Sequence, residues 1–338
     1  MPHASGPIDT AILAMLDAKA DAQGRLSFAD FMEVVLYTPQ VGYYRRPKKR
    51  VGRDPEADFY TSMGFRELFR DLIITASQTI WGEETCAKLT FVEVGAEPGN
   101  GLLDNGSHPF ADHRVLRLGD PIEIPPNALL FSNELFDAQP FHRLIRHHGV
   151  WREQGVCLQE NTLRETLLPE WSPTLAEAFP PRNLPTSAPE GYRIDLPIAS
   201  RKLLRDLLQP PWNGAFLAFD YGKPWEALSH DHPLGTARGY RHHRQVANLL
   251  ESPGKIDLTC DVCWDWLVED LLHAGFQNVE VERQERFFVT NVLAKWLANP
   301  DNCGRRDPAT LHRLQELIHP ERMGHRFQAI IADRFTQL

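Results

Sequence analysis

Residues 89–101 read Leu-Thr-Phe-Val-Glu-Val-Gly-Ala-Glu-Pro-Gly-Asn-Gly, and this stretch decides the fold. A short apolar run that leads directly into glycines is typical of a strand buried on both faces of a parallel sheet. Two further runs of this kind occupy residues 128–131 and 215–219. Helical patterns separate these runs, so we predict an α/β fold with a mostly parallel, doubly wound sheet.

Apolar residues at helical spacing predict helices over residues 8–19, 27–37, 65–80 and 261–274. Ser27, with Asp30 three residues later, resembles a capping box and predicts that the second helix begins there. From residue 89 onward strands alternate with helices. We therefore predict a helical N-terminal region at 1–88, followed by a sheet domain at 89–338.

An insertion interrupts the sheet domain at about residues 141–200. Residues 141–158 predict a β-hairpin that turns at His148-Gly149. Seven prolines lie between residues 164 and 197. We predict that this proline-rich segment is irregular and serves as a lid or as a cover over the sheet.

Charge and hydropathy exclude two broad classes of protein. The 338 residues carry a formal net charge of −9, whereas nonspecific nucleic-acid binding needs a basic surface. No apolar run approaches the ~20 residues that a membrane span requires. The acidic balance mildly favours a cationic substrate, and we expect a protein partner rather than a nucleic acid.

Five cysteines are too few and too scattered for a disulfide framework. Cys260 and Cys263 form a single Cys-x-x-Cys pair, but a zinc site would need two more ligands. We therefore predict no metal site. Free thiols in a chain of this size favour the reducing cytoplasm.

Polar residues follow each of the three apolar runs, and parallel sheets bind ligands at the carboxyl ends of their strands. The three groups are Glu93 with its glycines, Asn133-Glu134-Leu135-Phe136-Asp137, and Asp220-Tyr221-Gly222. Each group also fits a structural role, as a glycine turn, a cap or a surface loop. Glu134 gains nothing from following an apolar strand, so a function is favoured there.

Several blocks, in order from about residue 28 to the end of the chain, resemble the MidA-like family of class I S-adenosylmethionine methyltransferases. That family includes a mitochondrial protein arginine methyltransferase. The blocks are Gly42-Tyr43-Tyr44, Asp58-Phe59-Tyr60-Thr61-Ser62, Asn133-Glu134-Leu135-Phe136-Asp137-Ala138, Asp220-Tyr221-Gly222, Gly235-Thr236, Tyr240-Arg241, Asp257-Leu258-Thr259 and Pro320-Glu321-Arg322-Met323-Gly324.

The resemblance implies a Rossmann-like methyltransferase domain, S-adenosyl-L-methionine as cofactor and a protein arginine as substrate. The methionine end of the cofactor would lie on Glu93, Gly95, Gly99 and Gly101. Asp120 would serve the ribose or the adenine, or cap a turn. The residues at the transferred methyl group would be Asn133, Glu134 and Asp137, and the last two would orient a guanidinium. The substrate-binding residues would be Asp220, Tyr221, Arg238 and His242.

The sequence departs from the family pattern between the first two apolar runs. Glu97 and Pro98 are inserted into the glycine loop, and the span from Gly101 to Ala128 has room for only one strand, at residues 115–118. Two hypotheses follow: an active methyltransferase with a reduced adenosine site and weak cofactor binding, or a degenerate, non-catalytic relative that binds a protein partner. A thiol redox role for Cys260 and Cys263 is a distant third.

Overall fold

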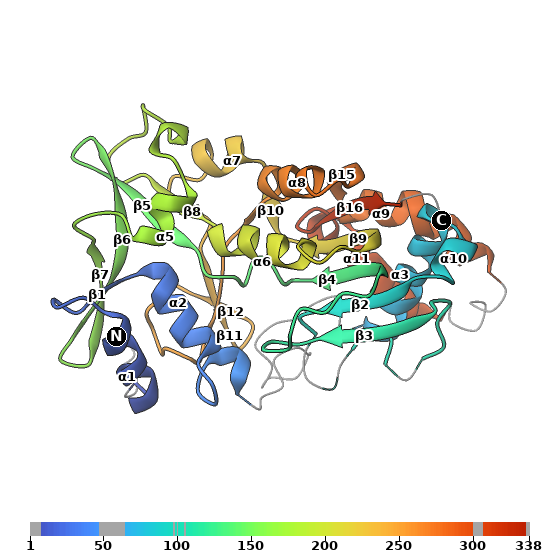
Figure 1. The fold of residues 1–338 in the computed structure, drawn as a ribbon, viewed down its shortest axis with the longest axis horizontal. Helices are drawn as coiled ribbons and strands as arrows, with labels where there is room; N and C mark the ends of the chain where they lie inside the picture. The colour runs from blue at the N-terminus through green and yellow to red at the C-terminus, as the bar shows by residue number, and fades with distance from the viewer. Residues whose placement is uncertain are drawn as a thin grey trace. The chain divides into compact units, whose positions relative to one another are not determined.

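The structure is a computed structural model that describes residues 8–46, 65–96, 99, 101–104, 106–299 and 307–335. The predicted block at 58–62 and the inserted Glu97 and Pro98 lie outside these residues. The chain forms two compact units (Figure 1). Unit 1 consists of residues 1–60, 136–202 and 223–263, and unit 2 consists of residues 61–135, 203–222 and 264–338. The predicted helices at 8–19 and 27–37 and the insertion therefore belong to unit 1, whereas the predicted helix at 65–80 belongs to unit 2.

Unit 2 is built on a six-stranded sheet with the strand order β15-β16-β9-β4-β2-β3. Its strands are β2 (Thr90–Val94), β3 (Asp112–Leu116), β4 (Asn127–Asn133), β9 (Asn213–Asp220), β15 (Gln277–Arg283) and β16 (Gln328–Arg334). The pairs β2–β3, β2–β4 and β4–β9 are parallel, and β16 is antiparallel to both of its neighbours. Five of the six strands thus run in one direction, which agrees with the predicted mostly parallel sheet.

The chain reverses its course across this sheet at β2. From β2 it continues to β3 on one side and then returns to β4 on the other side, so that β2, β3 and β4 lie side by side (Figure 1). Ligands of open α/β sheets bind outside the carboxyl ends of the strands at such a reversal. The ends of β2 and β4 are therefore the expected ligand site of unit 2.

The connections on either side of β3 are short. No described residue between β2 and β3 is helical, and residues 117–126 contain no helix. The prediction of a single strand in this span is confirmed, although β3 begins and ends earlier than the predicted residues 115–118. Its first half is polar, with Asp112, His113 and Arg114, because β3 is the edge strand and half of its backbone faces away from the sheet.

The helices of unit 2 are α3 (Arg66–Ile80), α4 (Glu83–Cys86), α8 (Trp264–His273), α9 (Gln284–Phe288), the π-helix η4 (Val289–Leu293), α10 (Ala294–Ala298), α11 (Pro308–Ile318) and the π-helix η6 (Pro320–Gly324). Phe69 of α3 packs on the sheet, with ring centroids 6.3 Å from Phe131 and 5.7 Å from Phe219.

The predicted helix at 261–274 begins only at Trp264. No described helix is long and apolar enough to cross a bilayer.

Unit 1 contains two antiparallel sheets. One joins β1 (Arg25–Ser27), β6 (Val150–Gln159), β5 (His142–His147) and β8 (Arg193–Leu196), with β7 (Thr162–Leu167) also on β6. The other has the order β12-β11-β13, from Arg244–Val246, Arg238–Arg241 and Asp257–Thr259. β5 and β6 are the predicted hairpin, with its turn at His148-Gly149. The predicted irregular segment at 164–197 is bounded by β7 and β8, which extend the hairpin into a sheet, and only two short helices interrupt the loop between these strands.

The helices of unit 1 are α1 (Thr10–Lys19), α2 (Phe28–Tyr37), η1 (Tyr43–Arg45), α5 (Pro173–Ala178), η3 (Pro181–Asn183) and α7 (Trp225–His230), and its last strand is β14 (Val262–Cys263). Helix α6 (Ile198–Leu208) and strand β10 (Gly222–Lys223) each continue from one unit into the other. Ser27 is the N-cap of α2, since its hydroxyl accepts a hydrogen bond from the Asp30 amide at 3.0 Å.

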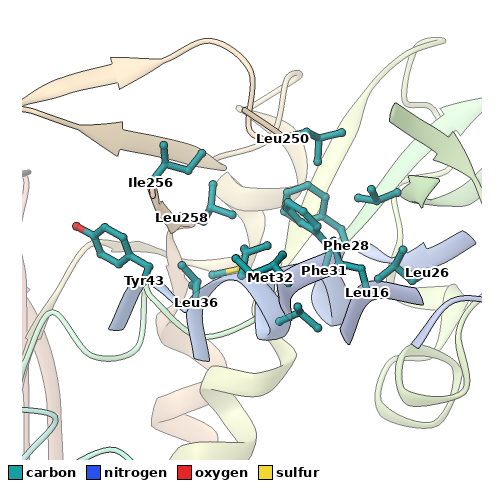
Figure 2. Close-up of a cluster of buried hydrophobic side chains, with 14 of the residues drawn as sticks. Leu16, Leu26, Phe28, Phe31, Met32, Leu36, Tyr43, Leu250, Ile256 and Leu258 are labelled. Carbon is teal, nitrogen blue, oxygen red and sulfur yellow. The ribbon is translucent and has the colours of Figure 1, made fainter. Parts of the chain in front are cut away.

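The core of unit 1 forms around α2. Figure 2 shows Phe28, Phe31 and Met32 of this helix gathered with Leu250 and Leu258, which come from the segment around β13. Phe28 also stacks on Phe141, with ring centroids 5.1 Å apart. Because residues more than 200 positions apart share this core, unit 1 depends on contacts that are remote in the sequence.

Candidate active site

Glu93 is a buried carboxylate near the end of its strand. It lies on β2 one residue before the strand's end, and its Oε2 accepts a hydrogen bond from the Leu102 amide at 2.5 Å. Burial raises the pKa of this carboxyl group to about 7, and the nearby Asp104 adds to the rise, while the hydrogen bond from Leu102 opposes it. Glu93 therefore changes its charge near neutral pH.

The glycine loop after β2 needs glycine for two different reasons. Gly95 has φ +84°, and a Cβ there would lie 2.6 Å from the Leu135 side chain. Gly99 has φ +72°, but a Cβ there would meet no other described residue within 4 Å. At Gly95 the loop is thus packed against the end of β4, whereas at Gly99 only the backbone conformation demands glycine. Gly101 is buried, and a Cβ on it would come within 3 Å of the Asp104 carboxylate.

At the end of β4, the backbone of Glu134 adopts a left-handed conformation with φ +52°. Its amide donates to the Phe219 carbonyl at 2.9 Å, which fixes this turn to β9. The side chain is held as well, because Asn133 Nδ2 donates to Glu134 Oε1 at 3.0 Å. A non-glycine residue in this conformation costs energy and is found preferentially at functional sites.

Asp220 joins the ends of β4 and β9. It is buried; its Oδ2 accepts a hydrogen bond from the Leu135 amide at 3.2 Å, and its Oδ1 accepts one from the Tyr221 amide at 2.8 Å. Tyr221 packs on Phe327, with ring centroids 4.1 Å apart. Unit 2 therefore brings together Glu93, the three predicted glycines, Asn133, Glu134 and Asp220 at neighbouring strand ends.

Asp120 lies on an exposed turn beyond β3. Its Oδ2 accepts a hydrogen bond from the Arg117 amide at 2.8 Å, and its own amide donates to the Arg117 carbonyl at 3.0 Å. The carboxylate therefore caps this turn, which was one of the three predicted roles. A ribose or adenine contact by Asp120 stays a prediction.

Asp137 lies in unit 1, within a cluster of buried carboxylates formed by Asp137, Asp195, Asp257 and Asp261. Arg238 Nη2 lies 2.5 Å from Asp261 Oδ1. Burial works against the Arg238 charge, yet Asp261 and its neighbours raise the pKa of the guanidinium above its ordinary value. The predicted residues Asp137 and Arg238 thus share one electrostatic environment.

Two tyrosines of the N-terminal segment belong to the same environment. Tyr44 donates to Asp257 Oδ1 at 2.7 Å, and Tyr37 donates to the Ala138 carbonyl at 2.8 Å. Burial and the carboxylates of Asp257 and Asp137 raise the pKa of both phenols, so both remain protonated donors at neutral pH. This accounts for Tyr44 of the Gly42-Tyr43-Tyr44 block.

Asp195 is a structural centre that sequence reasoning missed. Its carboxylate accepts hydrogen bonds from Arg143 Nε at 2.8 Å and from the amides of Thr236 and Ala237 at 2.7 and 2.8 Å. A Cβ on Gly235 would lie 2.3 Å from Asp195 Oδ2, which explains the glycine of the Gly235-Thr236 block. An acid between two apolar residues, in Ile194-Asp195-Leu196, was the only sequence signal.

His242 lies at the exposed tip of the β11–β12 hairpin. His242 and His243 have φ values of +49° and +60°, as a two-residue type I′ turn requires. The structure thus gives His242 a turn role, and substrate binding by it stays a prediction.

Cys260 offers little support for redox chemistry. It and Cys263 are buried, and neither forms a disulfide. Burial raises the pKa of the Cys260 thiol well above its ordinary value, and the surrounding carboxylates raise it further. Because the thiolate is the reactive form, this environment works against thiol exchange.

Comparisons with known proteins agree on one family. A family model described as "Putative S-adenosyl-L-methionine-dependent methyltransferase" matches residues 112–280, which is half of the chain. The mitochondrial protein arginine methyltransferase NDUFAF7 of Danio rerio is 26% identical, with 96% of this chain and 87% of that protein covered. The human protein of the same name is 25% identical, with 96% and 83% covered.

Solved structures share the fold. A superfamily member from Burkholderia thailandensis, crystallised with S-adenosyl-homocysteine, superposes with a TM-score of 0.78 at 24% identity, covering 96% of this chain and 92% of that one. A second structure from the same organism gives a TM-score of 0.76 at 23% identity, covering 96% and 91%.

Proposed function

We propose that this chain transfers a methyl group to an arginine side chain of a protein. The chain belongs to the family of S-adenosyl-L-methionine-dependent methyltransferases whose model it matches. Two observations support arginine as the acceptor. The relatives from zebrafish and human carry the name protein arginine methyltransferase. In this chain, carboxylates follow β4 and suit a guanidinium, which pairs with planar acceptors.

The residues at the ends of β2 and β4 fit the cofactor. Its amino group is a cation, and Glu93 is a buried carboxylate beside the glycine loop. Gly99 leaves open space where a ligand could approach the backbone. Asn133 Oδ1 is buried and has no hydrogen-bond donor among the described residues, so a donor from a ligand would satisfy it. Glu93, Gly95, Gly99 and Gly101 would hold the methionine end.

The cofactor, when bound, supplies an electrophilic methyl group on a sulfonium. In the transfer, a bond forms between a guanidinium nitrogen and the methyl carbon, the sulfur–carbon bond breaks, and the nitrogen loses one proton. Glu134 would accept hydrogen bonds from the guanidinium, fix its plane and take up that proton. Asn133 would keep the Glu134 carboxylate in place through its 3.0 Å hydrogen bond.

The left-handed backbone at Glu134 is the observation that carries this proposal. Glycine would adopt φ +52° without cost, yet the chain places a glutamate there, at the sheet reversal where ligands bind. A side chain retained against this conformational cost is expected to have a use.

The test is single-turnover methyl transfer from labelled cofactor to lysate proteins, followed by identification of the modified amino acid. The Glu134→Gln variant keeps the shape and removes the charge. We expect unchanged affinity for S-adenosyl-homocysteine and a loss of turnover of about 10²-fold, the scale for a catalytic acid or base. Glu123→Gln, an exposed change in the same unit, is the matched control and should keep full turnover.

Three outcomes would change this conclusion. Full activity of Glu134→Gln would remove Glu134 from the mechanism. Methyl groups on lysine or on a small molecule would remove arginine as the acceptor. Cofactor binding without any transfer would favour the non-catalytic alternative, in which the chain binds a protein partner.

We retain the cytoplasm as a proposed location. It is supported by the cysteines Cys86, Cys157, Cys260 and Cys263, none of which forms a disulfide, as is usual in a reducing compartment. The curated relatives are named as mitochondrial proteins. Fractionation of cells that produce the tagged chain would decide between the two.

A further inference from the structure

In the part of the chain that the structure describes, no helix follows the glycine loop of unit 2. In doubly wound sheets the loop after the first strand leads into a helix, whose N-terminus orders the loop amides. Here none of the described residues between β2 and β3 is helical. The amides of the loop must therefore be ordered by another part of the chain.

Two carboxylates hold two consecutive amides of this loop. The Gly101 amide donates to Asp104 Oδ2 at 2.8 Å, and the Leu102 amide donates to Glu93 Oε2 at 2.5 Å. The Asp104 amide in turn donates to the Gly101 carbonyl at 3.2 Å, so Asp104 binds both the amide and the carbonyl of Gly101. The Leu102 and Leu103 side chains are buried, which anchors the turn to the core of unit 2.

A histidine of strand β3 contacts the Asp104 carboxylate. His113 Nε2 lies 3.5 Å from Asp104 Oδ1, and His113 Nδ1 lies 3.3 Å from His108 Nε2. A carboxylate repels a lone pair, so in the neutral ring the proton of His113 belongs on Nε2. His113 Nδ1 is then an acceptor, and His108 must donate from Nε2.

We propose that Asp104 is a positioning residue of the cofactor loop, in which its carboxylate, backed by His113 and His108, replaces the missing helix by holding the Gly101 amide. This inference rests on the proposed function only for the identity of the ligand. It assigns to Asp104 a role in shaping the loop and in setting the charge of Glu93.

The second part of that role follows from electrostatics. Asp104 raises the pKa of Glu93, whereas Arg117 and Arg66 lower it. Among the described residues, the charged or titratable groups around the turn are Glu93 on β2, Arg66 and Arg70 on α3, His113 on β3, and His108 and Arg117 on the flanking segments. Removing the Asp104 charge should therefore make Glu93 ionise at a lower pH.

The first measurement uses the free protein. In ¹⁵N-labelled protein, Asp104→Asn should shift the Gly101 amide proton upfield, because a neutral acceptor replaces a charged one, and should leave the Leu102 amide nearly unchanged. Imidazole ¹⁵N shifts should show both His113 and His108 protonated on Nε2. An unchanged Gly101 amide proton would overturn the proposal without reference to any ligand.

The second measurement is calorimetric titration with S-adenosyl-homocysteine from pH 5.5 to 8.5. Asp104→Ala should weaken binding about 10- to 100-fold, the scale for one charge-assisted hydrogen bond. Asp104→Asn should bind more nearly like the parent above pH 8 but shift the pH midpoint of binding toward acid. A residue whose charge does not act on Glu93 would not move this midpoint.

Glu123→Gln is the control for loss of one exposed charge and should change neither affinity nor midpoint. Parent-like binding by Asp104→Ala at every pH would overturn the proposal. If Asp104→Ala does not fold, the midpoint of Asp104→Asn decides. Absence of binding by the parent would contradict the proposed function instead, and the Gly101 amide shift would still decide the role of Asp104.

Discussion

Replacing Glu93 with glutamine should stabilise the free protein at neutral and alkaline pH. The raised pKa means that folding disfavours the charged carboxylate. The stability that the protonated group contributes is fully present below its ordinary pKa of 4.5 and is lost as the pH rises to about 7. At ~1.4 kcal/mol per pH unit, this rise corresponds to about 3 kcal/mol. Glutamine keeps the acceptor for the Leu102 amide and avoids the loss.

Urea unfolding followed by tryptophan fluorescence would measure the effect. The free energy of unfolding of the parent minus that of Glu93→Gln should fall by about 2.5 kcal/mol between pH 5 and pH 8. Saturating S-adenosyl-homocysteine should stabilise the parent more at pH 8 than at pH 5.5, because its ammonium pairs with the ionised carboxylate. A difference between the two proteins that is constant over this pH range would refute the reasoning.

Two further changes test the loop and the centre of unit 1. Gly99→Val should fold, since its Cβ meets no other described residue, at a cost in folding free energy of about 1–2 kcal/mol for the left-handed backbone. This variant should show no S-adenosyl-homocysteine binding in calorimetry, and parent-like binding would make the loop an ordinary turn. Asp195→Ala should lower the free energy of unfolding by about 3–5 kcal/mol, because the buried Arg143 loses its closest carboxylate. A loss below about 1 kcal/mol in urea unfolding would contradict this prediction.

Strands that are buried on both faces were predictable from sequence. Strands β2, β4 and β9 are continuous apolar runs, and no other element explains such runs followed by turn residues. The small strands of unit 1 were not predictable. β1 pairs with β6, more than 120 residues away, and β7 has no buried side chain, so neither carries a local apolar pattern.

The site divides in the same way. The placement of Glu93, Asn133 and Glu134 at the ends of β2 and β4 was predictable, because buried apolar runs lead into these residues. Their roles toward cofactor and substrate stay predictions. Asp195 and Asp104 were missed because their roles arise from partners brought together by folding. For Asp195 the partners are 41 and 52 positions away, and for Asp104 the supporting His113 lies on an edge strand.

The position of β16 in the sheet has a consequence for synthesis on the ribosome. Although residues 328–334 come late in the chain, β16 lies between β15 and β9 rather than at an edge. Until these residues emerge, β9, with its run Ala215-Phe216-Leu217-Ala218-Phe219, presents an open apolar edge to solvent. Nascent chains stalled before residue 328 should therefore bind chaperones and aggregate, whereas longer ones should resist protease.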